Sequence, residues 1–87
     1  MGVFTVTYSP AAFKALRRMP QKTARRVVAK VEALAADPHA PNNNVKALTG
    51  RPAYRLRVGD YRVIYTLDDG IRVLAVEDVG PRGSIYE

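Results

Sequence analysis

The chain has 87 residues, enough for one small domain over residues 1–87 with its own hydrophobic core. Its 47% hydrophobic and 25% charged residues argue against a disordered chain, and the lack of cysteine excludes a disulfide framework and a thiolate metal site. No apolar run approaches the roughly 20 residues that a membrane-spanning helix needs. The first residues do not resemble a secretion signal, so we expect a cytoplasmic protein. The formal net charge of +6 favours a polyanionic partner such as nucleic acid, or an acidic protein.

The chain begins with a predicted strand and a short helix. Residues 3–8 alternate apolar side chains with threonine, which is typical of a strand. Ser9 suits the N-cap of a helix, and the Met19-Pro20 pair ends that helix because the residue before proline avoids the α region. We expect Phe13 to belong to the buried stripe of this helix and to pack against Tyr8.

A second helix is predicted over residues 21–36. Its apolar residues recur at the spacing of one buried helix face. Lys22, Arg26 and Lys30 form a basic ridge on another side of this helix. Such a ridge is usually a solvated face, and the alternative is a contact with nucleic-acid phosphates. The two helices together predict a hairpin that covers one face of a sheet.

Residues 38–52 are predicted to form a loop. The segment contains three asparagines in a row and four residues that break regular structure, namely Pro38, Pro41, Gly50 and Pro52. Lys46 lies here and adds to the basic character of the chain. The single histidine, His39, is expected to be an exposed loop residue without a catalytic role.

The central segment, residues 54–67, predicts two paired strands joined at Gly59 and Asp60. Both halves alternate apolar and polar side chains, which is the pattern of strands with one buried face. If the apolar sets face the core, the register places Arg55, Arg57 and Arg62 together on the open face. Three guanidinium groups on one surface need an anion, although Arg62 could instead pair with an acidic residue at 77 or 78.

A last strand is predicted over residues 71–79, after a turn at Asp69-Gly70. This strand has apolar residues at both alternating sets of positions, so we expect it to be covered on both faces and central in the sheet. The resulting order is strand, two-helix hairpin and three-stranded antiparallel meander (β-α-α-β-β-β), with the helices on one sheet face. The fold class is therefore α+β.

The residues exclude several chemistries. The sequence contains no phosphate-binding glycine loop and no histidine and carboxylate cluster at metal-ligand spacing, so we expect no metal and no cofactor. What remains is an arginine-rich face together with tyrosines. Guanidinium groups suit phosphate oxygens, and RNA carries its own nucleophile in the 2′-hydroxyl. These residues alone fit an RNA-cleaving site and a purely phosphate-binding surface equally well.

The sequence resembles the RelE/ParE superfamily of toxins from type II toxin–antitoxin modules, most closely the RelE-like branch. The resemblance rests on the segment KALTGRPAYRLRVGDYRVIYTLDDG, on the ending VGPRGSIY and on the strand-helix-helix opening. It implies a fold of the microbial ribonuclease type. It also implies a ribosome-dependent endoribonuclease that cleaves mRNA in the A site by 2′-hydroxyl attack and inhibits translation. A cognate antitoxin protein would bind this toxin in a hetero-oligomer.

The resemblance also implies roles for individual residues. Arg62 matches an arginine that stabilises the phosphate, Arg82 a C-terminal arginine of similar role, and Tyr86 a tyrosine that stacks on the base or transfers a proton. Arg55 and Arg57 match residues that hold the RNA backbone, and we group Lys46 with these two.

The chain departs from the family pattern at two positions near its end. Pro81 and Gly83 stand where many relatives have histidine, lysine or another basic residue, which weakens the acid–base part of the expected site. Two alternatives therefore stay open: a ParE-like toxin that inhibits DNA gyrase by binding, and a non-catalytic RNA-binding module.

Overall fold

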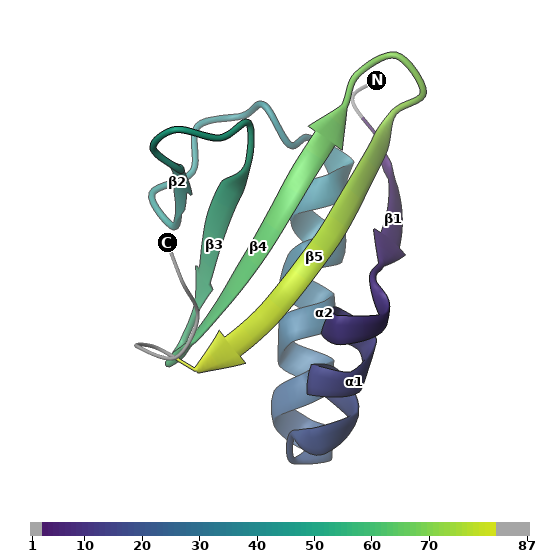
Figure 1. Cartoon of the computed structure of the whole chain (residues 1–87), viewed down its shortest axis with the longest axis vertical. Helices are drawn as coiled ribbons and strands as arrows, with labels where there is room; N and C mark the ends of the chain where they lie inside the picture. The colour runs from purple at the N-terminus through teal and green to yellow at the C-terminus, as the bar shows by residue number, and fades with distance from the viewer. Residues whose placement is uncertain (1–2, 82–87) are drawn as a thin grey trace.

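The computed structural model describes residues 3–81 of the chain. These residues form one five-stranded sheet with two helices packed on a single face (Figure 1). The elements follow in the order β1 (Thr5–Tyr8), α1 (Pro10–Arg18), α2 (Gln21–Ala36), β2 (Val45–Ala47), β3 (Tyr54–Val58), β4 (Tyr61–Asp68) and β5 (Val73–Pro81). The predicted α+β class, with helices before an antiparallel meander, is confirmed.

The sheet has the strand order β1-β5-β4-β3-β2. β3, β4 and β5 pair antiparallel as a meander, and β2 adds antiparallel to the outer edge of β3. β1 lies parallel to β5, which is possible because the two helices carry the chain back across the sheet. β5 therefore has a strand on each side, as predicted, but β4 is the middle strand of the sheet. The prediction that β5 is covered on both faces is wrong, because both helices pack on one face and the burial of Val73–Val76 alternates.

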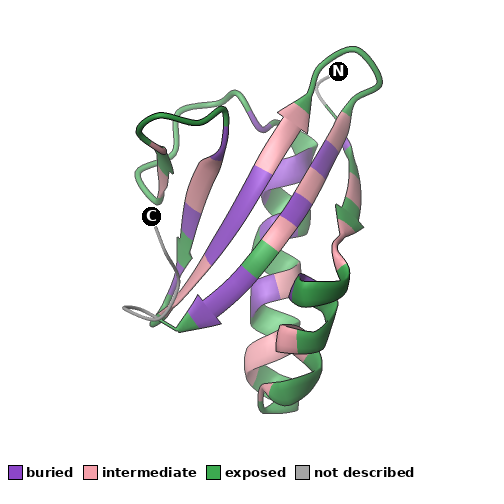
Figure 2. Ribbon diagram, in the orientation of Figure 1, coloured by how far each residue is buried: buried purple, intermediate pink, exposed green. Residues whose placement is uncertain are grey.

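The core lies between the helices and the sheet (Figure 2). The strand residues predicted to face inward do so, and Leu56, Val63 and Val79 are register partners that are all buried. From α2 the buried side chains are Val27, Val31, Leu34 and Ala35, at the spacing of one helix face. The apolar periodicity thus predicted both sides of this core.

The first helix differs from the prediction. Its N-cap is confirmed, since the Ser9 hydroxyl accepts a hydrogen bond from the backbone N–H of Ala12 at 3.0 Å. Phe13, however, is 57% exposed, and Arg17 lies 5.9 Å from its ring centroid. The fully buried residue of this helix is Ala12, because the close approach of α1 to the sheet leaves room there only for a small side chain.

Two further boundaries differ from the prediction. The loop predicted over residues 38–52 contains β2, a three-residue strand that pairs with β3. β5 begins at Val73 rather than at residue 71, because the turn after β4 is longer than two residues. Within that turn Arg72 has φ of 55°, a left-handed conformation that cannot continue a strand.

Candidate nucleic-acid interface

The side of the sheet opposite the helices carries the arginines that the alternation predicted to lie together. β3 and β4 pair so that Arg57 stands opposite Arg62 and Arg55 stands opposite Ile64. On the outer side of β3, Lys46 is the register partner of Arg55. Register partners project to the same face of a sheet, so Lys46, Arg55, Arg57 and Arg62 share one surface, which we call the basic face.

The closest pairing of like charges on the basic face is Arg57 with Arg62. Directly opposed side chains in an antiparallel pair have Cβ atoms about 5 Å apart, and like charges there are destabilising. Arg57 is exposed, whereas Arg62 is half-buried between neighbouring strands. A phosphate group accepts two guanidinium forks at once, so it would turn this repulsion into two charge-assisted contacts.

The acidic residues near the end of β5 take different positions. Glu77 is an extra residue in β5, because Ile64 pairs with Asp78 while the next residue of β4 pairs with Val76. The Glu77 carboxylate accepts a hydrogen bond from Arg51 at 2.5 Å. Register places Arg62 opposite Gly80 rather than opposite either acidic residue.

The tyrosines of β3 and β4 belong to the core side of the sheet. Tyr65 is 1% exposed and stacks on Tyr54, with ring centroids 5.4 Å apart and an interplanar angle of 22°. Burial, and to a smaller extent Tyr54, raises the pKa of Tyr65 to about 12. Tyr61 is half-buried on the same side. The prediction that Tyr65 serves packing is confirmed. Tyr61 lies on the same side of the sheet, so neither tyrosine faces the basic face.

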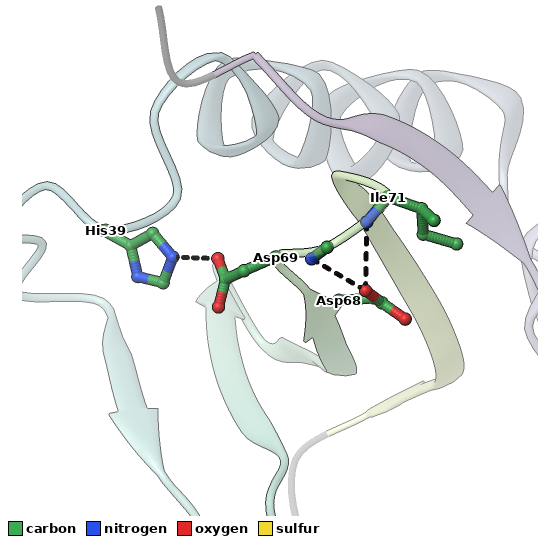
Figure 3. A network of polar contacts seen from close by, with 5 residues as sticks. His39, Asp68, Asp69 and Ile71 are labelled. Carbon is green, nitrogen blue, oxygen red and sulfur yellow. Dashed lines mark hydrogen bonds and ion pairs between the residues drawn. The ribbon is translucent and has the colours of Figure 1, made fainter.

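The single histidine lies in a polar network at the far end of the sheet (Figure 3). His39 and the Asp69 carboxylate are in contact, with 2.6 Å between Nε2 and Oδ1. The neighbouring Asp68 carboxylate accepts hydrogen bonds from the backbone N–H groups of Gly70 and Ile71, which fixes the turn. Asp68 is six residues from Arg62 along β4, about 20 Å at the rise of a strand. His39 therefore cannot act on an anion held by the basic face.

Several expected site residues lie outside the part of the chain that the structure describes. Arg82 and Tyr86, together with Gly83, follow the last described residue, Pro81. Within residues 3–81 no group of His, Asp and Glu side chains is placed to hold a metal ion. None of the helices in those residues is both long and apolar enough to cross a bilayer.

Sequence patterns did not locate a pocket that lies on the helix side of β3. A pocket of about 520 Å³ lies between α2 and β3, and we call it the α2–β3 furrow. Arg26 and Lys30 of the predicted basic ridge line it, together with Arg57 of the basic face. The i, i+4 spacing of the ridge was visible in the sequence, but its proximity to Arg57 depends on how α2 crosses the sheet.

The fold is similar to that of solved toxins. It is similar to the archaeal RelE–RelB complex from Pyrococcus horikoshii OT3, with 30% sequence identity and a TM-score of 0.80. This match covers 95% of this chain and 99% of the matched chain. The toxin–antitoxin complex RelBE2 from Mycobacterium tuberculosis matches with 24% identity, 97% of each chain and a TM-score of 0.82. The intact E. coli RelBE complex matches with 23% identity, 91% of this chain, 96% of that chain and a TM-score of 0.73.

A family model gives the same result from sequence. Residues 6–86 match the model described as the ParE toxin of the type II toxin–antitoxin system, parDE. No curated protein matches the chain. Fold and family model together define the toxin component of a type II toxin–antitoxin system. The chain belongs to the ParE toxin family within the RelE/ParE superfamily, and its structural relatives place it in the RelE-like branch, as the sequence predicted.

Proposed function

We propose that this toxin is a metal-independent endoribonuclease that cleaves mRNA by attack of a 2′-hydroxyl, acts in the ribosomal A site and so inhibits translation. The observation that carries the proposal is the opposition of Arg57 and Arg62 on a face that also holds Arg55 and Lys46. Such a row suits a chain of phosphates better than a single small anion. RNA supplies the nucleophile, so the protein has to orient the backbone and stabilise charge.

In this mechanism the residues have separate tasks. Arg62 stabilises the phosphorane as negative charge develops on its oxygens, since a guanidinium fork can contact two of them. Lys46, Arg55 and Arg57 hold the neighbouring phosphates and set the position of the scissile bond. Arg82 supplies a second charge at the phosphorane, and Tyr86 stacks on the base or transfers a proton; these two roles follow from the family resemblance.

The toxin is also proposed to bind a cognate antitoxin in a hetero-oligomer. The similar structures from Pyrococcus horikoshii, Mycobacterium tuberculosis and E. coli are all toxin–antitoxin complexes. A net charge of +6 favours an antitoxin that presents an acidic segment.

The test is cleavage of mRNA on programmed ribosomes by wild type and by variants of Arg62. Arg62→Ala should lower the cleavage rate by about 10²–10³-fold, the cost of removing one group that stabilises transition-state charge. Arg62→Lys should recover part of the rate, because it restores the charge but not the fork. Lys14→Ala is the matched control, since Lys14 is an exposed cation of α1, on the other side of the sheet. An Arg62→Ala protein that cuts at the wild-type rate would contradict the proposal.

A second candidate function is inhibition of DNA gyrase by binding. The description of the matching family model, which is that of a ParE toxin, favours it. Pro81 and Gly83, which stand where many RelE-like relatives have basic residues, favour it as well. Purified toxin that blocks gyrase supercoiling and leaves ribosome-bound mRNA intact would establish this function instead. RNA binding without cuts and without gyrase inhibition would indicate a non-catalytic RNA-binding module.

A further inference from the structure

Asp78 of β5 places a carboxylate on the same side of the sheet as the basic face. It is the register partner of Ile64, which lies two residues from Arg62 along β4 and therefore shares its face. The next residue, Val79, is 3% exposed in the core, as the alternation of side chains along a strand requires. Asp78 itself is exposed. Its carboxylate is therefore accessible to an RNA strand that lies on the basic face.

Arg62 and Asp78 are diagonal neighbours on this face. Arg62 pairs with Gly80, which follows Asp78 by two residues. Because Gly80 has no side chain, Asp78 supplies the first side chain of β5 beside Arg62 among the described residues of the open face. Diagonal neighbours of a sheet are about 7–8 Å apart, within reach of a long side chain. One nucleotide can therefore contact Arg62 through its phosphate and Asp78 through its ribose.

The two adjacent carboxylates of β5 differ in their contacts. The Glu77 carboxylate accepts a hydrogen bond from Arg51 at 2.5 Å. Neither of the two ion pairs seen within residues 3–81 includes Asp78. Its Oδ1 accepts a hydrogen bond from the backbone N–H of Val79 at 2.8 Å, which sets the direction of the carboxylate. An ionised carboxylate has further lone pairs, so Asp78 can still accept a proton from a ligand.

The proposed cleavage needs a group that accepts the proton of the 2′-hydroxyl. The arginines of the basic face stay protonated and cannot accept it. Tyr61 and Tyr65 face the other side of the sheet, and His39 lies at its far end (Figure 3). A carboxylate is a common general base, and Asp78 places one beside Arg62.

We propose that Asp78 is a catalytic residue of this toxin, the general base that takes the proton from the attacking 2′-hydroxyl. The O2′–P bond forms while the P–O5′ bond breaks, and Arg62 stabilises the charge on the other phosphate oxygens. The electron pair of the P–O5′ bond leaves with O5′, which takes a proton from water, and Asp78 returns its proton to the solvent. The products are a 2′,3′-cyclic phosphate and a 5′-hydroxyl. The inference rests on the proposed function and adds the residue that activates the nucleophile.

The first test is single-turnover cleavage of mRNA on programmed ribosomes by Asp78→Asn. The amide oxygen of asparagine can still accept the hydrogen bond from Val79, so this variant should fold. Its cleavage rate should fall by at least about 10²-fold, the lower end of what a general base contributes. Its affinity for a message that has a 2′-deoxynucleotide at the cleavage site should stay the same or rise, because a negative charge has left the face that binds phosphates.

Two further variants serve as controls. Glu77→Gln makes the same charge change at the adjacent residue, whose carboxylate is bound to Arg51, and should cut at close to the wild-type rate. Asp78→Glu keeps a carboxylate and should cut faster than Asp78→Asn.

A modified substrate separates a general base from a general acid. A message with sulfur in place of O5′ at the scissile bond releases a thiolate, which needs no proton because a thiol is a stronger acid than an alcohol. This leaving group relieves the loss of a general acid but not the loss of a general base. Asp78→Asn should therefore stay slow on the sulfur message by about the same factor as on the normal message.

Three results would overturn the inference. The first is wild-type cleavage by Asp78→Asn, or recovery of its rate on the sulfur message. The second is an equal loss of rate in Asp78→Asn and Glu77→Gln, which would mean that the rate follows net charge. The third is an equal rate in Asp78→Asn and Asp78→Glu.

The Arg62 variants separate this inference from the proposed function. If any of those three results appears while Arg62→Ala loses cleavage, the nuclease proposal stands and only the assignment of the base fails. A wild-type toxin that never cuts ends the nuclease proposal and this inference together.

Discussion

Arg57 and Tyr65 show how far the alternation of strand residues determines individual side chains. The alternation within β3 places Arg57 on the open face beside Arg62, and the alternation within β4 places Tyr65 in the core. Both positions were predictable from the sequence. The position of β3 residue 57 at the edge of the α2–β3 furrow was not predictable, because the furrow depends on the packing of α2 near the edge of the sheet. The exposure of Phe13 was missed for a similar reason, since a short helix can turn either of two adjacent apolar residues inward.

Tyr65→Phe should not destabilise the protein. The Tyr65 hydroxyl is buried and has no hydrogen-bond partner among the described residues, and an unpartnered buried polar group costs about 1–3 kcal/mol. Removal of the hydroxyl should therefore raise the free energy of unfolding by about 1 kcal/mol, measured by urea denaturation. A decrease of more than about 1 kcal/mol would mean that the hydroxyl has a partner in solution.

The raised pKa of Tyr65 predicts a further difference between the two proteins at alkaline pH. A phenol with a pKa of about 12 in the folded state and about 10 in the unfolded state favours folding fully below pH 10. That contribution is lost as pH rises from 10 to 12, because only the unfolded protein can then ionise readily. Wild-type stability should therefore fall more steeply than that of Tyr65→Phe over this interval. Parallel curves in urea denaturation would contradict this.

At the scale of elements, the long periodic segments were predictable and the short or paired ones were not. α2, β3 and β4 match the expected ranges because each repeats its pattern over its whole length. β2 has only three residues between prolines and glycine, so it exists because the edge of β3 accepts it. The parallel pairing of β1 with β5 joins distant parts of the chain, and no local pattern reports such a pairing.

The Ser9 hydroxyl connects α1 to β5, so Ser9→Ala should destabilise the fold. Its hydroxyl caps α1 through the N–H of Ala12 and donates to the carbonyl of Glu77 in β5 at 2.5 Å. Loss of an N-cap costs about 1 kcal/mol, and loss of the second bond should bring the total to about 2 kcal/mol. Thermal or urea unfolding measures the change, and Ser9→Thr is the control because it keeps a hydroxyl at the cap. Equal stability of the Ala and Thr variants would show that neither bond contributes.

At the scale of the whole molecule, the net charge of +6 has a structural counterpart. The helices pack on one face of the sheet, so the other face is left for Lys46, Arg55, Arg57 and Arg62. The sequence predicted that the three arginines share a face, because side chains alternate strictly between the two faces of a strand. The contribution of Lys46 became clear only with β2, which brings it opposite Arg55.

Four cations on one face predict a definite salt dependence of RNA binding. If each contacts one phosphate of a single strand, the logarithm of the affinity should fall with the logarithm of salt concentration with a slope of about −3. Arg57→Ala should reduce the magnitude of the slope by about 0.7, whereas Lys14→Ala should leave it unchanged. Fluorescence anisotropy at several salt concentrations measures the slope. The same slope for all three proteins would show that binding is spread over the whole basic surface.

The most direct test of the proposed nuclease is cleavage of an mRNA that carries one 2′-deoxynucleotide. The residue is placed immediately 5′ of the bond that the toxin cuts in the unmodified message on programmed ribosomes. Attack by the 2′-hydroxyl predicts that this bond stays intact while the toxin still binds the message, and that cuts in the unmodified message leave a 2′,3′-cyclic phosphate. Cleavage of the modified bond at the unmodified rate would contradict the mechanism.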